Sequence, residues 1–254
     1  MSDSPNTGFD FLNAVEVGFK QVVAAHSTGW AAIKVFGGQV VVLLFGPPGS
    51  GKGTQAARIT GSLGVPAIST GNMLRAEIDA DTSLGRKAAA ILKRGGLVDD
   101  GLVNEMLAAR LQRPDCRDGF LLDGYPRTVA QSRFLDRLLH EQGFPQPVVI
   151  HLDVPFHVLV QRLSARRQCG SCGRIYSSGT KCEQCGGTLQ QRADDRPEVI
   201  SERLRTYAEQ TDPVVEFYLY GDYHMVNADR PPDEVYKEIE GVLENVLVRV
   251  ARAR

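Results

Sequence analysis

The chain has 254 residues, of which 43% are hydrophobic and 23% charged, and its formal net charge is −1. This balance is typical of a globular protein with a sizeable core. The near-neutral charge gives nucleic acid or a membrane surface no bulk attraction, and the sequence has no apolar run long enough to span a bilayer. The first residues lack the basic and apolar segments of a secretory signal, so we expect a cytoplasmic protein.

The N-terminal extension, residues 1–38, contains one predicted helix. Between residues 11 and 23 the apolar side chains recur at helical spacing, at Phe11, Leu12, Val15, Phe19, Val22 and Val23. The apolar face of this amphipathic helix is available to pack on the main domain, on a second subunit or, less favourably because few basic residues accompany it, on a membrane. We expect a monomer in which this helix serves as a contact surface.

A glycine-rich segment, Gly46–Thr54, follows the first predicted strand, Val40–Phe45, and precedes a predicted helix that begins near Gln55. A strand, a glycine loop and a helix in this order make an anion site, because the loop amides and the positive end of the helix dipole point to one place. Lys52 adds a charge where the β- and γ-phosphates of a nucleotide would lie. The hydroxyl of the usual pattern comes one residue late, at Thr54, so we expect another group to organise the metal. The alternative, a plain turn with a surface lysine, fits the flanking strand and helix less well.

Short apolar strands then alternate with helices along the chain. The predicted strands are Val65–Ser69, Gly119–Asp123, Val148–Asp153 and Tyr223–Asn227, and the predicted helices include Leu102–Leu111, Val129–Gln142 and Pro197–Tyr207. This alternation predicts an α/β fold of the P-loop type. Such a fold is a doubly wound parallel five-stranded sheet with helices on both faces, and it binds ligands at the carboxyl ends of its strands.

Two insertions interrupt the alternation in the main domain, residues 39–254. Residues 69–98 are mostly helical in pattern, whereas residues 165–196 are too polar and too rich in turns to form core. We expect both insertions to be mobile and to reach over the ligand edge of the sheet. The predicted core then comprises residues 39–68, 99–164 and 197–254.

A carboxylate and an arginine are predicted beside the glycine loop. Asp123 ends a strand, where it can hold Mg²⁺, often through water. Arg127 follows four residues later on a turn that contains a proline. Beside a phosphate loop, we favour this functional interpretation over a turn with a solvated Asp and Arg.

Further arginines flank the second insertion, at Arg162, Arg166, Arg167, Arg192, Arg196 and Arg203. Arg162 and Arg166, four residues apart, are expected on one helix face, and Arg196 and Arg203 roughly share another. If the insertion closes, these cations converge on phosphates and stabilise the charge of a transferring phosphoryl group. The alternative is a solvated charged face that pairs locally with Asp194, Asp195 and Glu198.

Four of the five cysteines form two Cys-x2-Cys pairs separated by nine residues, at Cys169, Cys172, Cys182 and Cys185. This spacing predicts a structural site with four sulfur ligands, for zinc or another tetrahedral metal such as iron. Two disulfides are less favoured in a reducing cytoplasm. The remaining Cys116 stands alone, and the histidines show no ligand spacing, which indicates surface or core residues: His26, His140, His151, His157 and His224.

Together these segments resemble the adenylate kinase family, in its form with a long zinc-bearing lid. The resemblance covers about residues 39–250 and is carried by several motifs in the expected order. They are the Gly46–Thr54 loop, the segments Ile68–Arg75 and Gly119–Thr128, the four cysteines, and the segment Gln191–Glu198.

The resemblance implies reversible phosphoryl transfer from MgATP to AMP, giving two ADP, with structural zinc in the lid. Residues 69–98 would bind the monophosphate, and residues 165–196 would form the lid over ATP. The implied catalytic residues are Lys52, Asp123, Arg127, Arg166, Arg192 and Arg203. Those implied for AMP are Thr70, Arg75, Gly96, Leu97, Val98, Gly124, Tyr125, Pro126, Arg127, Gln131, Arg192 and Arg203. Those implied for ATP are Gly49, Ser50, Gly51, Lys52, Gly53, Thr54, Arg162, Arg166, Ile175, Tyr176 and Arg230.

Two residues bear on the details of this resemblance. Asn72 stands where the family usually has Asp, which removes one negative charge near the acceptor. Related kinases for UMP or CMP tend to carry Ala in place of Thr70, so Thr70 favours AMP over another monophosphate. A non-catalytic nucleotide sensor is disfavoured by the full set of arginines with Lys52. A nucleic-acid-binding zinc ribbon is disfavoured by the near-neutral charge.

Overall fold

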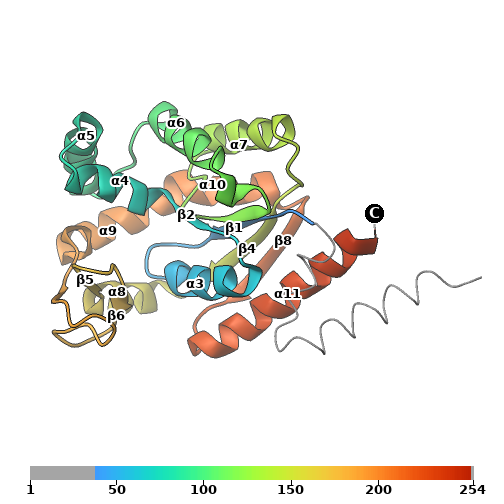
Figure 1. Ribbon diagram of the computed structural model, residues 1–254. Coiled ribbons are helices and arrows are strands. Elements are labelled where there is room, and N and C mark those ends of the chain that lie inside the picture. Colours follow the sequence, from blue (N-terminus) through green and yellow to red (C-terminus); the bar gives the residue numbers. More distant parts are fainter. Residues whose placement is uncertain (1–37, 253–254) are drawn as a thin grey trace, which may run out of the picture.

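The computed structural model describes residues 38–252, and Figure 1 shows their arrangement around a central sheet. The helix expected at residues 11–23 lies outside the described residues. The sheet has five parallel strands in the order β2-β3-β1-β4-β8, which confirms the predicted α/β fold. The strands are β1 (Val40–Phe45), β2 (Ala67–Ser69), β3 (Gly119–Asp123), β4 (Val148–Asp153) and β8 (Asp222–Asn227).

The strand order places a topological switch point at β1. From β1 the chain crosses to the edge strand β2, returns to β3, and then continues on the other side of β1 with β4 and β8. Crevices at the carboxyl ends of strands on either side of a switch point bind ligands in open α/β sheets. The glycine loop leaves β1 at this end of the sheet.

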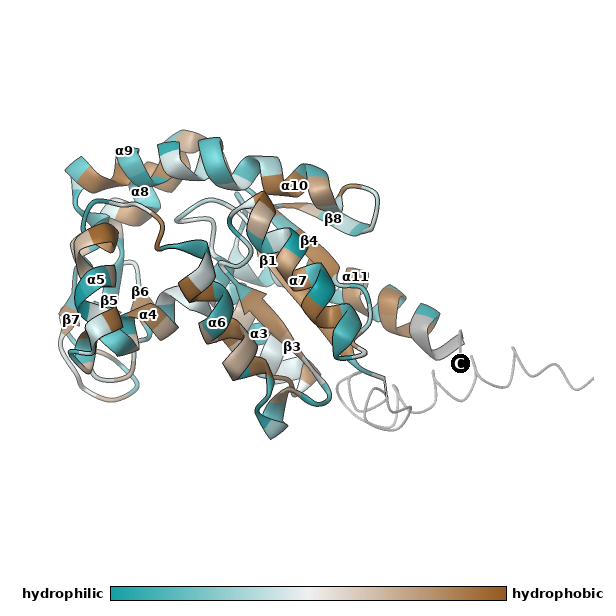
Figure 2. Cartoon of the chain, turned by 90° about the horizontal axis from the view of Figure 1, so that it is seen from above, coloured by the Kyte–Doolittle hydropathy of each residue, from teal (hydrophilic) through white to brown (hydrophobic). Residues whose placement is uncertain are grey.

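Every residue of β1 is buried, with alternate side chains in two separate apolar layers. Val40, Val42 and Leu44 face a layer that includes α3 (Lys52–Leu63), α8 (Phe156–Ala165) and α11 (Pro232–Arg252). Val41, Leu43 and Phe45 face the layer that includes α6 (Asp100–Leu111), α7 (Val129–Glu141) and α10 (Asp212–Tyr218). Because both faces are covered, the strand is apolar throughout rather than alternating. Figure 2 shows the hydrophobic strands enclosed by helices whose outer sides are hydrophilic.

The first insertion is a pair of helices, α4 (Thr70–Asp79) and α5 (Ser83–Leu92). Thr82 caps α5 by accepting a hydrogen bond from the Gly85 amide at 2.9 Å. Gly85 lets the two helices approach, because a Cβ there would lie 2.0 Å from the carbonyl oxygen of Glu77. Residues 93–99 form turns and irregular chain instead of continuing the helix.

The second insertion follows α8 and contains a small antiparallel sheet in the order β6-β5-β7. Its strands are β5 (Arg167–Cys169), β6 (Ile175–Tyr176) and β7 (Leu189–Gln190). The chain continues through η2 (Ala193–Asp195), α9 (Pro197–Thr206) and a π-helical turn, η3 (Tyr207–Thr211), into α10. Both insertions lie beyond the same end of the central sheet (Figure 1).

A short 3₁₀ turn, η1 (Pro114–Cys116), precedes β3.

Within the part of the chain that the structure describes, no helix combines the length and the apolar character that crossing a membrane requires.

Candidate active site

The glycine loop between β1 and α3 has a backbone conformation that requires glycine at three positions. Gly46, Gly49 and Gly51 have φ values of 141°, 89° and 98°. A Cβ on Gly46 would also lie 2.8 Å from the carbonyl oxygen of Leu152. Helix α3 begins directly after Gly51, at Lys52, so loop amides and the helix N-terminus form one anion cradle.

The ammonium of Lys52 is held at this loop. It donates hydrogen bonds to the carbonyl oxygens of Gly46 at 2.6 Å and Pro47 at 3.0 Å. Burial lowers the pKa of Lys52 to about 8, although Asp123 opposes the change. Among residues 38–252, no group hydrogen-bonds to the buried hydroxyl of Ser50. A buried cation and an orphaned hydroxyl in one cradle fit an anionic ligand.

Asp123 lies at the carboxyl end of β3, where it pairs in register with Leu44 of β1 and Ser69 of β2. Its carboxylate therefore lies beside the loop, close enough to act on the pKa of Lys52. Carboxylate oxygen is the ligand type that Mg²⁺ prefers, so Asp123 suits a metal that accompanies a polyphosphate. Thr54 is exposed on the first turn of α3.

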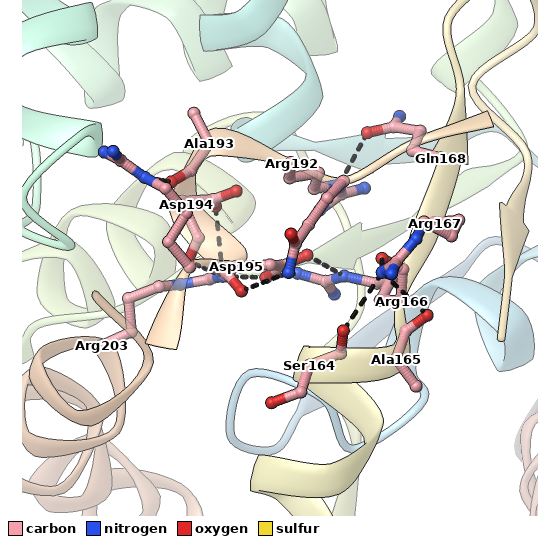
Figure 3. A network of polar contacts seen from close by, with 12 residues as sticks. Ser164, Ala165, Arg166, Arg167, Gln168, Arg192, Ala193, Asp194, Asp195 and Arg203 are labelled. Atoms are coloured by element: carbon pink, nitrogen blue, oxygen red, sulfur yellow. Dashed lines mark hydrogen bonds and ion pairs between the residues drawn. The ribbon is translucent and has the colours of Figure 1, made fainter. Parts of the chain in front are cut away.

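Two arginines from different helices share one buried carboxylate, as Figure 3 shows. Arg166 follows α8 and binds Asp195 with both arms, Nε to Oδ2 at 2.6 Å and a terminal nitrogen to Oδ1 at 2.5 Å. Arg203 on α9 donates to the same Oδ1 at 2.7 Å, and to the backbone carbonyl of Asp194 at 3.0 Å. The Asp195 side chain has no exposed surface. It therefore fixes both guanidinium groups at the junction of lid and core.

Arg192, Arg127 and Arg75 complete the cation cluster. The Nε of Arg192 donates to Gln168 in the lid at 2.6 Å, and that of Arg127 to the carbonyl of Gly124 at 2.8 Å. Burial is the main cause that lowers the pKa of all three arginines, and of Arg192 to about 9. Neighbouring cations of the cluster lower these pKa values further. Mutual repulsion on this scale indicates a site that receives several negative charges.

The other arginines near the lid make different contacts. Arg167 donates to backbone carbonyls at the end of α8, including that of Ser164 at 3.1 Å, and Arg196 to that of Ala193 at 3.0 Å. Arg162 and Arg166 do not share a helix face, because α8 ends at Ala165 and Arg166 is already extended. Arg162 instead binds the loop after β8.

That loop and strand β6 contain the residues predicted for the adenine of ATP. Arg162 donates to the carbonyl of Ala228 at 3.0 Å, and Arg230 pairs with Glu238. Ile175 is partly exposed on β6, next to Tyr176. The role of these residues in binding ATP stays a prediction.

A pocket with about 590 Å³ of empty space, its open mouth included, lies between the first insertion and the core. Nine residues predicted for AMP line it: Thr70, Arg75, Gly96, Leu97, Val98, Gly124, Arg127, Gln131 and Arg203. Tyr125, Pro126 and Arg192 are not part of its lining. Tyr125 lies in the core, where its hydroxyl donates to Asn104 at 2.6 Å.

Sequence reasoning missed several groups in the wall of this pocket. Leu74, Leu92 and Val103 supply its apolar surface, and Gly95 and Asp194 also line it. The signal available for Leu74 was its position one helical turn after Thr70. Gly95 has a φ of 81°, and a Cβ there would lie 2.8 Å from the Arg203 side chain.

Gln131 is held rigidly at the edge of this pocket. Its Oε1 accepts from the Arg127 amide at 2.7 Å, and its Nε2 donates to Asp100 at 2.7 Å. Thr128 donates to the other oxygen of Asp100 at 2.6 Å. The side chain is 2% exposed. One N–H and one lone pair of the amide remain for a ligand in a fixed direction.

The four lid cysteines form one cluster of free thiols, with all sulfur atoms within 4.8 Å of one another. Cys169 and Cys185 are 3.5 Å apart, as are Cys172 and Cys182. A tetrahedral zinc site with Zn–S bonds of about 2.3 Å separates its sulfurs by about 3.8 Å, so the cluster fits a zinc ion.

The family model for adenylate kinase matches residues 44–222. The chain belongs to the adenylate kinase family. It is 45% identical over 210 residues to an adenylate kinase of Thermosipho melanesiensis, a match that covers 80% of this chain and 98% of that protein. It is 44% identical over 211 residues to one of Thermodesulfovibrio yellowstonii, with the same coverage of each chain. It is 42% identical over 213 residues to one of Archaeoglobus fulgidus, covering 81% of this chain and 98% of that protein.

These comparisons confirm the resemblance inferred from the motifs. The adenylate kinases match this chain over almost their whole length, from glycine loop to lid. About a fifth of this chain lies outside each alignment.

Proposed function

We infer that this protein is an adenylate kinase, which reversibly transfers a phosphoryl group from MgATP to AMP and so forms two molecules of ADP. The observation that carries this conclusion is the position of the cation cluster. Lys52, Arg127, Arg166 and Arg203 lie within electrostatic reach of one another, between the glycine loop and the pocket predicted for AMP. A phosphoryl group that passes from ATP at the glycine loop to AMP in the pocket crosses this cluster.

The geometry supports catalysis by alignment and charge stabilisation. The phosphate of AMP is already ionised near neutral pH, so the acceptor oxygen needs no general base. We propose that Lys52 follows the transferring group, while Arg127 and Arg203, which line the AMP pocket, hold the acceptor phosphate. Arg166 and Arg192 reach the same place from the lid, so closure of the lid would complete the site and exclude water.

We propose that Asp123 holds the Mg²⁺ that accompanies ATP, which would supply positive charge against the phosphates. Zinc, in contrast, would have four protein ligands and no open position, so we assign it a structural role in the lid. We propose that residues 69–98 and 165–196 act as the AMP-binding and lid domains, because they supply the pocket wall and the cysteine cluster.

We also propose that the enzyme works as a monomer in the cytoplasm, with the predicted helix at residues 11–23 as a contact surface. Four free thiols arranged for zinc suit a reducing compartment, which supports the proposed location. Sedimentation of the full chain and of a chain shortened to begin at residue 38 tests the role of the helix.

A coupled assay of ADP formation tests the reaction. With ATP as donor, AMP should be the preferred acceptor over UMP, CMP and GMP. Lys52→Met should lose roughly three orders of magnitude in kcat, because it removes a charge aimed at the transition state. Lys87→Met, on the exposed side of α5, is the matched control and should keep the activity of the wild type. Equal turnover of Lys52→Met and the wild type would refute the assignment, and a preference for another monophosphate would correct the acceptor.

A further inference from the structure

A histidine in β4 has no role in the transfer described above. His151 is partly buried in a strand that is otherwise apolar until its last residue. Its register neighbours are Phe45 of β1 and Met225 of β8. Phe45 is the last residue before the glycine loop. The imidazole therefore lies beside the point where this loop leaves the sheet.

Both ring nitrogens of His151 meet a tyrosine hydroxyl. Nδ1 lies 2.6 Å from the hydroxyl of Tyr223 on β8, and Nε2 lies 3.4 Å from that of Tyr207 at the start of η3. A neutral imidazole has one donor and one acceptor nitrogen, so it accepts from one hydroxyl and donates to the other. These three side chains, which we call the Tyr-His-Tyr chain, connect β8, β4 and η3.

The Tyr207 end of this chain reaches the catalytic groups on two sides. Burial raises the pKa of the Tyr207 hydroxyl, and the backbone of Gly46 lies close enough to oppose this change. The carbonyl of Gly46 in turn accepts from Lys52 at 2.6 Å. Tyr207 also follows Arg203 by four residues, directly after the last residue of α9. A Tyr207 side chain held in place therefore supports both the first glycine of the loop and the end of the helix that carries Arg203.

The turn that Tyr207 opens makes a second contact with the site. Thr211, its last residue, donates to the backbone carbonyl of Arg127 at 3.2 Å. Residues 207–211 form a π-helical turn, a conformation frequent at functional sites. The turn thus lies near the glycine loop at one end and is hydrogen-bonded to Arg127, in the turn after β3, at the other.

We propose that His151 is a positioning residue for phosphoryl transfer, which in its neutral form holds Tyr207 against the glycine loop and on protonation weakens that hold. The proposal rests on the adenylate kinase reaction inferred above. An imidazolium has two donors and no acceptor, so the hydroxyl that donated to the neutral ring loses its acceptor and must turn its proton away. It also places a second cation near the buried ammonium of Lys52.

The surroundings of the imidazole favour its neutral form, because burial outweighs the opposing effect of the nearby carboxylate. Burial lowers the pKa of His151, and Lys52 lowers it further, whereas Asp153 on the same strand raises it. Asp212 at the start of α10 faces the two tyrosines and raises the pKa of both hydroxyls, in addition to the larger effect of burial. The hydroxyls stay protonated as a result and remain available as donors.

Substitutions in the full-length enzyme test the positioning role. At about pH 8, His151→Leu should lower kcat about tenfold and leave the KM for AMP within about twofold, because other elements form the AMP pocket. Tyr207→Phe should cause the same loss, and the double variant should lose no more than either single variant. The matched control is His140→Gln at the exposed end of α7, which should keep the kcat of the wild type.

The effect of protonating His151 is tested with His151→Gln, which keeps a hydrogen-bond donor and an acceptor but does not titrate. The ratio of wild-type kcat to His151→Gln kcat should fall by up to about twofold between about pH 8 and about pH 5.5, since the titration of the substrate phosphates is common to both enzymes. A constant ratio would overturn the proposal, as would wild-type kcat in His151→Leu. If His151→Leu does not fold, Tyr207→Phe and His151→Gln decide the question.

An imidazole titration followed by NMR, in the enzyme without substrates, gives a readout that does not depend on activity. The signal that disappears in His151→Gln should protonate below the ordinary range of histidine. Protonation at or above that range would overturn the proposal. If the wild type forms no ADP from ATP and AMP, the proposed function itself fails, and the NMR titration shows separately whether the imidazole behaves as stated.

Discussion

Binding of a polyphosphate at the glycine loop should be accompanied by proton uptake at Lys52. Burial lowers the pKa of this ammonium to about 8, in a loop where its hydrogen-bond partners are neutral carbonyls. A phosphate tail placed against the ammonium stabilises its charged form, so the pKa of Lys52 rises in the complex. At any pH above about 8, binding must therefore restore a proton that the free enzyme has lost.

The expected size of the uptake follows from the pKa. With a pKa of about 8, Lys52 is roughly nine-tenths neutral at about pH 9 and one-tenth neutral at about pH 7. Binding of ATP should then take up about 0.9 proton at about pH 9 and about 0.1 proton at about pH 7. The affinity for ATP at about pH 9 should be about tenfold weaker than at a pH where Lys52 is fully charged. This difference corresponds to about 1.4 kcal/mol of binding free energy.

Calorimetric titration with ATP, in pairs of buffers that differ in ionisation enthalpy, measures this uptake directly. The wild type is compared with Lys52→Met, and the difference isolates Lys52 from other groups that change their pKa on binding. Lys87→Met, a substitution on the surface of α5, should take up protons as the wild type does. An uptake that does not increase with pH, or that persists in Lys52→Met, would refute the assignment of a depressed pKa to Lys52.

Three other perturbations have expected outcomes. Asp195→Asn should lower the free energy of unfolding by about 3 kcal/mol in denaturant titrations, because it leaves Arg166 without its buried counterion and Arg203 with Asp194 alone. Chelation of the lid metal should lower the thermal transition and the activity together, and added zinc should restore both; a chelator with no effect would exclude a metal at the cysteines. Thr70→Ala should lower kcat/KM for AMP by about fivefold relative to other monophosphates, as measured with the acceptor panel, since Thr70 lines the pocket.

The central sheet could be predicted because its signal is local. The apolar run Val40–Phe45 is buried on both faces, as its composition indicates, and the glycines that follow it are needed for positive φ. The predicted ends of the strands and helices were less accurate. β2 begins at Ala67 and not at Val65, because Pro66 has no amide to donate and contributes only its carbonyl, to Leu121 at 3.0 Å. Helix α3 begins at Lys52, three residues earlier than expected, since Gly53 and Thr54 are weak helix formers.

The arrangement of side chains at the site could be predicted only where the motifs themselves encode it. The spacing of the cysteines was sufficient to place four thiols together. Helical phase was insufficient for Arg166, because the helix ends one residue before it and its partner is Asp195, 29 positions later. The two interpretations of the arginines that flank the second insertion are each partly correct. Arg166 and Arg203 converge, and they also pair locally with Asp195. His151 gave no signal in the sequence, because its partners are 56 and 72 residues away.

The cation cluster gives this site a need for a rigid frame. Buried like charges repel and each loses hydration, so the cluster opposes folding unless the core holds it in place. Asp195 holds two guanidinium groups of the cluster in place, but its single negative charge does not neutralise both of them. A guanidinium has five N–H donors, and Arg166 uses two of them on Asp195, so the remaining three stay available to an anion in a fixed direction. We expect a polyphosphate that enters the cradle to relieve this repulsion, because its negative charges offset the positive charges of the cluster.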